Sequence, residues 1–510
     1  MFVVTSEQMR EIEERAVNEL DVPSILLMEN AAFAVAERCM DWLGNGGTRN
    51  VVVICGRGKN GGDGFAVARL LHVRGVAVTV FFLGNENVTA GDSRINLEIT
   101  KKTGVEVIAV RDEGSMPYVR YALEKCSLVV DAIFGTGLNS DVKDVYLSAI
   151  NAINESARYV ISVDLPSGIS ADSGNIMGAA VQANQTVTLG FAKQGLYLHP
   201  GAEAAGEITI ASIGVPLVGP DRKTIILDDD EFASLLPARS GIGNKGTFGQ
   251  VYVLAGSDEM PGAAVLTASA AYKAGCGLVK AYVNRHAANI LQTQLIEATT
   301  KILPDTNGFL FIDSLPCTKE LNTARVILIG PGLGNNVHVK GFVLNVLTNA
   351  ETAVVIDADA LNVLAGGTSI LNKLKAPCVI TPHPGEMSRL TGLSIQEIVS
   401  NPIQTASHFA KQHNVITLLK GARTIVANPD GSVYINVTGN SSLAKAGSGD
   451  VLTGLIGAFI AQGKDAFAAA MLAAYLHGKA GEAAAETLSE YGVCARDILQ
   501  AVPRVLQQIR

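Results

Sequence analysis

Short apolar runs alternate with helical patterns along most of this chain, and the alternation limits the folds open to it. The runs read NVVVIC, VAVTVFFL, SLVVDAIF, YVISVD and TVTLGF in the first half, and QVYVLAG, RVILIG, TAVVIDAD, CVITPHP and VITLLK in the second. Buried strands that are separated by helices form parallel sheets with helices on both faces. The sequence therefore predicts an α/β protein.

A stretch without clear periodicity, residues 213–245, separates the two groups of runs. It contains several Pro and Gly residues and three consecutive Asp residues, which is typical of a connection between domains. A chain of 510 residues has room for about two to four domains of ordinary size. We therefore predict two α/β domains, at residues 1–215 and 225–507, of which the first is a Rossmann-like domain with three layers.

Composition and charge exclude several classes of partner. A formal net charge of −8 gives no electrostatic attraction to nucleic acid or to an anionic membrane. The sequence shows no signal-peptide pattern at its start and no run of about 18 apolar residues. Its seven cysteines are scattered and form no C-x-x-C pair, as expected for reduced thiols. We expect a cytoplasmic protein with neither a nucleic-acid nor a membrane partner.

The first apolar run leads into a glycine-rich loop, VVVICGRGKNGGDGF. Its glycines match the pattern G-x-G-x-x-G, in which backbone N–H groups bind phosphate at the start of a helix. A dehydrogenase with this pattern also carries an acid about 20 residues further on, which binds the ribose. Here the candidate acid, Glu86, stands too far along, and Asn60 and Asp63 place an amide and an acid inside the loop. Both features argue against a dehydrogenase.

Two further strand ends carry acids. Asp131 lies inside the run VVDAIF before a second glycine-rich loop, residues 135–141, and Asp164 ends the run VISVD before a Pro-Ser-Gly turn. Either Asp alone would more often be a turn or helix cap. Doubly wound sheets, however, bind ligands at the carboxyl ends of their strands. We therefore expect Asn60, Asp131 and Asp164 to converge on one site.

The motifs KNGGDGF, DAIFGTGL and VDLPSGI resemble those of the NAD(P)H-hydrate epimerases, over about residues 5–213. The resemblance implies that the hydrated dinucleotide binds to Lys59, Asn60, Gly61, Gly62, Asp63, Gly135, Thr136, Gly137, Leu138, Asn139, Ser140, Asp141 and Asp164. It also implies a potassium ion bound by Asn60, Asp131 and Ser167, whose oxygen atoms suit a hard cation. Asp164 is the candidate acid/base for the epimerisation. Lys59 stands where relatives often carry a second Asn.

In the second half, the loop AKAGSGD opens an amphipathic helix. Its small residues leave backbone N–H groups free to bind the negative charge of a phosphoryl group in transfer. Asp450, at the end of the loop, can accept a proton from the attacking hydroxyl. A helix-capping Asp is the alternative, but the Gly-Ser-Gly-Asp context favours catalysis. Other predicted strand ends carry Asp357, Asp359, His383 and Glu386, and no cluster has the spacing of a zinc site.

The motifs GTFGQVYVLAGS, GPGLG, DADALN, TPHPGE, LLKG and NSSLAKAGSGDVLTG resemble those of the ADP-dependent NAD(P)H-hydrate dehydratases, over about residues 225–507. The resemblance implies a ribokinase-like α/β domain that uses ADP with Mg²⁺. It assigns to the hydrate Ala264, Gly332, His383 and Asp450. It assigns to the adenine nucleotide Lys420, Gly421, Ala422, Arg423, Thr424 and Gly449.

The order of the halves, epimerase before dehydratase, resembles that of bifunctional repair enzymes. Such an enzyme epimerises NAD(P)HX, the hydrated dinucleotide, and dehydrates its S form with conversion of ADP to AMP and phosphate. We expect NAD(P)HX and ADP as partners and assembly as a homo-oligomer. Two alternatives stay open. The second half could phosphorylate a small alcohol, as sugar and hydroxymethylpyrimidine kinases do, and the first half could be a binding module.

Overall fold

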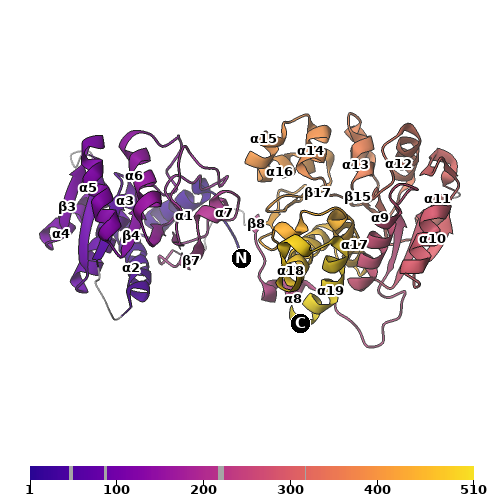
Figure 1. Cartoon of the computed structure of the whole chain (residues 1–510), viewed down its shortest axis with the longest axis horizontal. Helices are drawn as coiled ribbons and strands as arrows, with labels where there is room; N and C mark the ends of the chain where they lie inside the picture. The colour runs from indigo at the N-terminus through magenta and orange to yellow at the C-terminus, as the bar shows by residue number, and fades with distance from the viewer. Residues whose placement is uncertain (45–49, 85–88, 216–222, 316–317, 510) are drawn as a thin grey trace. The chain divides into compact units, whose positions relative to one another are not determined.

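The computed structural model describes residues 1–44, 50–84, 89–215, 223–315 and 318–509, so Glu86 lies outside the described residues. The chain divides into two compact units, which Figure 1 colours by residue number. The first unit comprises residues 2–222, and the second comprises residues 223–510 together with Met1. Each unit has its own mainly parallel sheet, which confirms the predicted α/β class.

Seven parallel strands form the sheet of the first unit, in the order β3-β2-β1-β4-β5-β6-β7. They are β1 (Asn50–Cys55), β2 (Ala77–Leu83), β3 (Glu106–Val110), β4 (Leu128–Ala132), β5 (Val160–Val163), β6 (Gln185–Leu189) and β7 (Glu207–Ala211). The order reverses between β1 and β4. Ligands bind at such a reversal, beyond the carboxyl ends of the strands.

Helices cover both faces of this sheet, because the side chains of a strand point alternately to its two faces. Val51 and Val53 of β1 pack with α2, α3 and α4, whereas Val52 and Ile54 pack with α5 and α6. The result is the predicted Rossmann-like arrangement of three layers. The helices of this unit are α1 (Ser6–Glu19), α2 (Ser24–Leu43), α3 (Lys59–Val73), α4 (Gly91–Lys102), α5 (Met116–Lys125), α6 (Asp144–Ser156) and α7 (Gly201–Ala204), with 3-10 turns η2 (Glu113–Ser115) and η3 (Gln194–Leu196).

Ten strands form the main sheet of the second unit, in the order β11-β10-β9-β14-β15-β16-β17-β18-β19-β8. From β11 to β17 the neighbours are parallel, and β18 is antiparallel to both β17 and β19. The strands, with the hairpin β12–β13, are β8 (Thr224–Ile225), β9 (Gln250–Leu254), β10 (Leu278–Val283), β11 (Thr299–Ile302), β12 (Asp305–Thr306), β13 (Phe309–Leu310), β14 (Val326–Ile329), β15 (Ala353–Ile356), β16 (Cys378–Ile380), β17 (Ile416–Leu419), β18 (Ile425–Ala427) and β19 (Val433–Ile435).

Helix α17 (Ser448–Ala461) is the most deeply buried helix that bears a predicted site residue. Every residue from Val451 to Ala461 is buried, and a Cβ at Gly454 would lie 2.3 Å from the carbonyl oxygen of Thr267 on α9. Only glycine permits this close approach between α17 and α9. The other helices are α8 (Asp229–Leu235), α9 (Pro261–Lys273), α10 (Arg285–Gln294), α11 (Thr318–Leu321), α12 (Val337–Asn349), α13 (Asp359–Leu364), α14 (Pro384–Thr391), α15 (Ile395–Ser400), α16 (Pro402–His413), α18 (Ala466–Gly492) and α19 (Ala495–Ile509), with η4 (Ile312–Ser314), η5 (Thr368–Lys373) and η6 (Ser441–Leu443). Among the described residues, none of these helices is long and apolar enough to cross a membrane.

Candidate active sites

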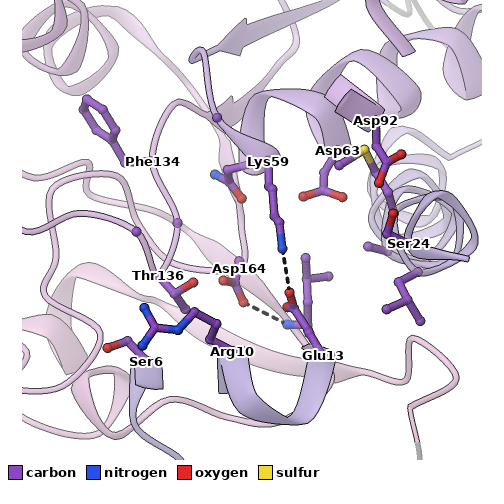
Figure 2. A pocket seen from close by; sticks show the side chains of 18 of the residues that line it. Ser6, Arg10, Glu13, Ser24, Lys59, Asp63, Asp92, Phe134, Thr136 and Asp164 are labelled. Atoms are coloured by element: carbon purple, nitrogen blue, oxygen red, sulfur yellow. Dashed lines mark hydrogen bonds and ion pairs between the residues drawn. The ribbon is translucent and has the colours of Figure 1, made fainter. Parts of the chain in front are cut away.

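A pocket of about 960 Å³ opens at the carboxyl ends of the strands in the first unit. Helix α1, α2, the start of α3, the loop after β4 and the residues that follow β5 and β6 line it. Figure 2 shows that the side chains of Lys59, Asp63 and Asp164 point into this space. The volume suits a ligand of considerable size.

Two predicted residues of the first unit, Asn60 and Asp164, come together at Gly135. A Cβ at Gly135 would lie 3.2 Å from Oδ1 of Asn60 and 3.4 Å from Oδ2 of Asp164. Residues 59–63, which the pattern placed in a loop, form the first turn of α3. The pocket is lined by Lys59, Asn60, Asp63, Gly135, Thr136, Gly137, Leu138 and Asp164. The remaining predicted residues, Gly61, Gly62, Asn139, Ser140 and Asp141, are not among the described residues that line it.

Asp131 is fully buried on β4 and is bound by two serines. Its Oδ2 accepts hydrogen bonds from Oγ of Ser162 at 2.8 Å and from the backbone N–H of Ser167 at 2.9 Å. Its Oδ1 accepts one from Oγ of Ser167 at 2.5 Å. Burial raises the pKa of Asp131, and the hydrogen bonds from Ser167 and Ser162 oppose this rise. The two serines therefore favour the ionised carboxylate.

The surroundings of Ser167 fit a potassium ion in their chemistry. Asp131, the hydroxyl of Ser167 and the carbonyl oxygen of Phe134, 3.3 Å from that hydroxyl, are hard oxygen ligands. Of Asn60, only Oδ1 can bind a cation, because the amide Nδ2, which is buried without a hydrogen-bond partner among the described residues, is a donor and not a ligand. In the described part of the chain, no cluster of three or more His, Cys, Asp or Glu could hold a metal. A cation here would rest on one carboxylate and on neutral oxygens.

Asp164 follows β5 in a left-handed conformation with a φ of +67°. This conformation is unusual for a residue other than glycine and often marks a functional site. Oδ1 of Asp164 accepts hydrogen bonds from the backbone N–H of Leu189 at 3.1 Å and from Nζ of Lys193. Lys193 follows β6, is 1% exposed and forms an ion pair with Asp164. Lys193 was not predicted as a site residue, although a lysine within the apolar stretch GFAKQGLYL was a possible signal.

A second carboxyl group faces the same pocket from α3. Asp63 is 7% exposed. Burial raises its pKa well above the ordinary value, and the negative charges of Asp164 and Glu13 raise it further. Lys59 opposes the rise and binds Glu13 at 3.1 Å, as the dashed line between them in Figure 2 shows. Asp63 therefore keeps its proton to a higher pH than an exposed Asp does.

In the second unit, residues at the ends of β15 and β17 meet the loop that opens α17. Nζ of Lys420 donates a hydrogen bond to Oδ1 of Asp357 at 2.9 Å and lies 3.7 Å from Oε2 of Glu386. A Cβ at Gly449 would lie 3.4 Å from Nζ of Lys420 and 3.8 Å from Oδ2 of Asp357. Burial lowers the pKa of Lys420, but the charges of Asp357 and Glu386 outweigh it, so the pKa is raised. The site therefore holds a fixed positive charge.

Asp450 lies on the first turn of α17 beside this charge. The helix begins after Gly447, whose φ is +86°. Burial raises the pKa of Asp450 to about 7; the charges of Asp357 and Asp359 add to the rise and Lys420 opposes it. A carboxylate whose pKa lies close to the working pH is well suited to accept a proton from a hydroxyl.

His383 forms the N-terminal cap of α14. Its Nδ1 accepts hydrogen bonds from the backbone N–H groups of Gly385 at 3.0 Å and Glu386 at 3.4 Å. These bonds indicate that Nε2 carries the proton. Burial lowers the pKa of His383, against the opposing charge of Glu386, and Lys420 lowers it further. His383 is therefore a neutral donor at pH 7.

The other predicted residues of the second unit lie in two places. The turn between β17 and β18 contains Lys420, Gly421, Ala422, Arg423 and Thr424. Ala264 is fully buried on α9. Gly332 follows β14, and a Cβ there would lie 2.7 Å from the carbonyl oxygen of Met260, which precedes α9. Ala264 and Gly332 thus lie close to the N-terminal end of α9.

Comparison with known proteins gives two family matches. Residues 24–195 match the family described as YjeF-related protein N-terminus, and residues 251–504 match the NAD(P)H-hydrate dehydratase family. Several solved structures resemble the second unit, including the following two. One is the ADP/ATP-dependent NAD(P)H-hydrate dehydratase from Bacillus subtilis, co-crystallised with ATP/Mg²⁺, with a TM-score of 0.50, 34% identity and coverage of 56% of this chain and 98% of that chain. The other is a ribokinase-like superfamily protein from Enterococcus faecalis, with a TM-score of 0.50, 26% identity and coverage of 58% and 99%. They confirm the predicted ribokinase-like fold.

A full-length relative has the same two parts. The bifunctional NAD(P)H-hydrate repair enzyme Nnr of Moorella thermoacetica is 42% identical over 515 residues, which cover 100% of this chain and 97% of that protein. An identity of this size over both halves confirms the resemblance that the motifs indicated. The chain therefore belongs to the family of bifunctional NAD(P)H-hydrate repair enzymes, with an epimerase domain followed by an ADP-dependent dehydratase domain.

Proposed function

We propose that residues 1–215 interconvert the R and S epimers of NAD(P)HX, and that residues 225–507 dehydrate the S epimer with ADP. The observation that carries the dehydration is the position of Asp450, a half-buried carboxylate on the first turn of α17 whose pKa is raised to about 7. Lys420 lies beside the same turn. A general base and a fixed positive charge are what the transfer of a phosphoryl group to a hydroxyl requires.

The dehydration begins at the hydroxyl on C6 of the hydrated ring, because hydroxide itself is a poor leaving group. Asp450 accepts the proton of this hydroxyl while the hydroxyl oxygen attacks the terminal phosphorus of ADP, and AMP leaves. The lone pair of the ring nitrogen then breaks the C6–O bond and expels phosphate. Loss of a proton from C5 restores the dihydropyridine. The N–H groups of Gly447 and Gly449 bind the negative charge that develops on the phosphoryl oxygens, whereas the N–H of Ser448 donates to the carbonyl oxygen of Lys445 at 3.3 Å.

The second site fits a magnesium ion that is bound mainly by the nucleotide. Magnesium commonly binds through substrate phosphates and only one or two carboxylates. Asp357 and Glu386, the carboxylates beside Lys420, are in place for this role. When bound, the ion neutralises charge on the phosphates. The Bacillus subtilis dehydratase that was co-crystallised with ATP/Mg²⁺ supports this assignment.

In the first unit, Asp164 is the proposed acid/base. Either of two routes inverts C6, the transient loss of its hydroxyl or the opening of the ring, and both require a proton transfer at the C6 oxygen. Asp164 lies at the pocket wall, and its Oδ1 is held by hydrogen bonds from Leu189 and Lys193. Residues 59–63 and 135–141 are the proposed binding segments for the hydrate. Self-association and a cytoplasmic location stay predictions.

Potassium is expected to support epimerisation through Asn60, Asp131 and Ser167. The bound ion supplies positive charge next to the substrate loop. We expect epimerase activity to be higher in potassium than in sodium buffer, and Asp131→Ala to remove both the difference and most of the hydrate affinity. The measurement is the conversion of isolated R epimer to S epimer in each buffer. Equal rates in both buffers, for the wild type and the variant alike, would exclude the site.

The whole proposal is tested by incubation of the protein with both epimers and ADP. The dihydronicotinamide absorbance should return for the complete sample, with one AMP and one phosphate formed per molecule repaired. A stable phosphorylated product would instead support the small-alcohol kinase alternative. Repair that ends with the R epimer untouched would support a first unit that only binds.

A further inference from the structure

Lys193 is a buried charge that the activities described above do not use. The side chain lies at the wall of the pocket and is 1% exposed. A buried ammonium group is costly unless it is paired and hydrogen-bonded. Its only ion-pair partner among the described residues is Asp164, the proposed acid/base.

The three N–H groups of Lys193 are all used within the protein. Nζ donates to Oδ1 of Asp164, to the carbonyl oxygen of Leu189 at 2.7 Å and to Oγ1 of Thr188 at 3.3 Å. An ammonium group has three donors and no acceptor. Lys193 therefore has no donor left for a substrate, so it acts through Asp164.

The same contacts place the two carboxylate oxygens of Asp164 in different surroundings. Oδ1 accepts hydrogen bonds from Lys193, from the backbone N–H of Leu189 at 3.1 Å and from Oγ1 of Thr188 at 3.4 Å. Oδ2 lies on the other side, where a Cβ at Gly135 would be 3.4 Å away. Gly135 begins the loop that is proposed to bind the hydrate, so Oδ2 is the oxygen that can exchange a proton with it.

The backbone on both sides of Lys193 is fixed by hydrogen bonds. The N–H of Val4 donates to the carbonyl oxygen of Ala192 at 2.8 Å, and the N–H of Gln194 donates to that of Val4 at 3.0 Å. Val4 and Lys193 pair as an isolated parallel bridge. The segment before α1 therefore holds the charge of Lys193 in one place.

We propose that Lys193 is a positioning residue of the epimerase reaction, which holds Asp164 by its Oδ1 and directs its Oδ2 toward the C6 hydroxyl of the hydrate. The inference rests on the proposed role of Asp164. Loss of the cation at Lys193 leaves the carboxylate of Asp164 beside the acids of the pocket, and removal of a nearby opposite charge disfavours an ionised carboxylate. The other charged residues that line the pocket are Glu7, Arg10, Glu13, Glu14, Arg57, Lys59, Asp63 and Asp92. Asp131 is the buried acid of β4.

The test is Lys193→Met in the full chain, because Met has a similar length but no charge. The conversion of isolated R epimer to S epimer is measured without nucleotide across a range of pH. At neutral pH we expect kcat/KM to fall about 10²-fold, the lower end of the effect of losing acid–base catalysis. The acid limb of the profile should move to higher pH. Lys193→Arg, which keeps the charge, should leave the limb in place, and so should Lys102→Met at the exposed end of α4.

The outcomes separate this inference from the proposed function. If Asp164→Ala retains epimerase activity, the role of Asp164 itself is wrong. If Asp164→Ala is inactive and folded Lys193→Met keeps the wild-type acid limb, only the role of Lys193 is wrong. If Lys193→Met does not fold, Thr188→Val replaces it, because it removes the hydroxyl shared by Lys193 and Asp164. A smaller shift to higher pH is then expected, and an unchanged limb would overturn the inference.

Discussion

Asp450→Asn is expected to abolish the ADP-dependent dehydration of the S epimer and to leave epimerisation intact. Asn keeps the size of the side chain but cannot accept the proton of the C6 hydroxyl, and loss of a general base typically lowers the rate by about 10²–10⁴-fold. The loss should lie in kcat, because the backbone groups of the loop still bind the nucleotide. The measurement is the return of dihydronicotinamide absorbance from pure S epimer with excess ADP.

The pH dependence of dehydration is a second test of the role of Asp450. Its pKa is about 7, and the ionised form is the base, so wild-type kcat/KM should rise with pH through about 7 and level off above it. The residual activity of Asp450→Asn should lack this limb. Asp465→Asn is the matched control, because Asp465 caps α18 with a hydrogen bond from the N–H of Ala468 and Asn caps a helix equally well. Asp450 is not the cap of α17, because the N-cap is Gly447 and no side chain caps the helix. Dehydration by Asp450→Asn near the wild-type rate would mean that Asp450 is not the base.

Asp164→Ala is expected to divide the repair of mixed epimers into two phases. The second unit should convert the S epimer quickly, since its own residues are unchanged. The R epimer should then recover only as slowly as the epimers interconvert unaided. The reason is geometric. The base and the loop that binds the phosphoryl group align the C6 oxygen of one epimer, and the C6 oxygen of the other epimer lies on the opposite face of the ring.

Two additions test this division of labour. A separate epimerase, added after the fast phase, should restore the second phase without changing the first. Asp41→Ala, which removes an exposed acid that binds Arg38 at 3.2 Å on α2, should repair the mixed sample in one phase. Consumption of both epimers by Asp164→Ala at one undiminished rate would contradict the role assigned to Asp164.

The sequence was sufficient for those features of the site that depend on strand ends. Parallel strands that are buried on both faces are continuous apolar runs, so their ends are visible, and so are residues such as Asp131 and Asp164 that stand at them. The general rule for doubly wound sheets predicted that Asn60, Asp131 and Asp164 converge. In the structure Asn60 and Asp164 meet at Gly135, whereas Asp131 is buried on β4 and is not among the described residues that line the pocket. The glycine pattern predicted a loop at residues 59–63, but these residues form the start of α3.

The contacts across neighbouring strands could not be predicted. Lys193 meets Asp164 because β6 pairs with β5. Lys420 follows β17 and reaches Asp357, which follows β15, across the end of the intervening strand β16. Nothing local in the sequence records such strand neighbours. A buried lysine is also rare, so an isolated lysine after a strand is normally interpreted as a surface residue.

The half-buried position of Asp450 makes catalysis and stability compete at this residue. Its pKa rises from an ordinary value of 3.8 to about 7 on folding, which corresponds to roughly 4 kcal/mol against the folded state once the group is ionised. The sign follows from the raised pKa, because the folded state binds the proton more tightly than the unfolded chain does. This penalty is absent below about pH 4 and complete above about pH 7. Selection of heat-resistant variants by stability alone, at alkaline pH, would therefore favour replacements of Asp450 that raise the free energy of unfolding but no longer dehydrate the hydrate.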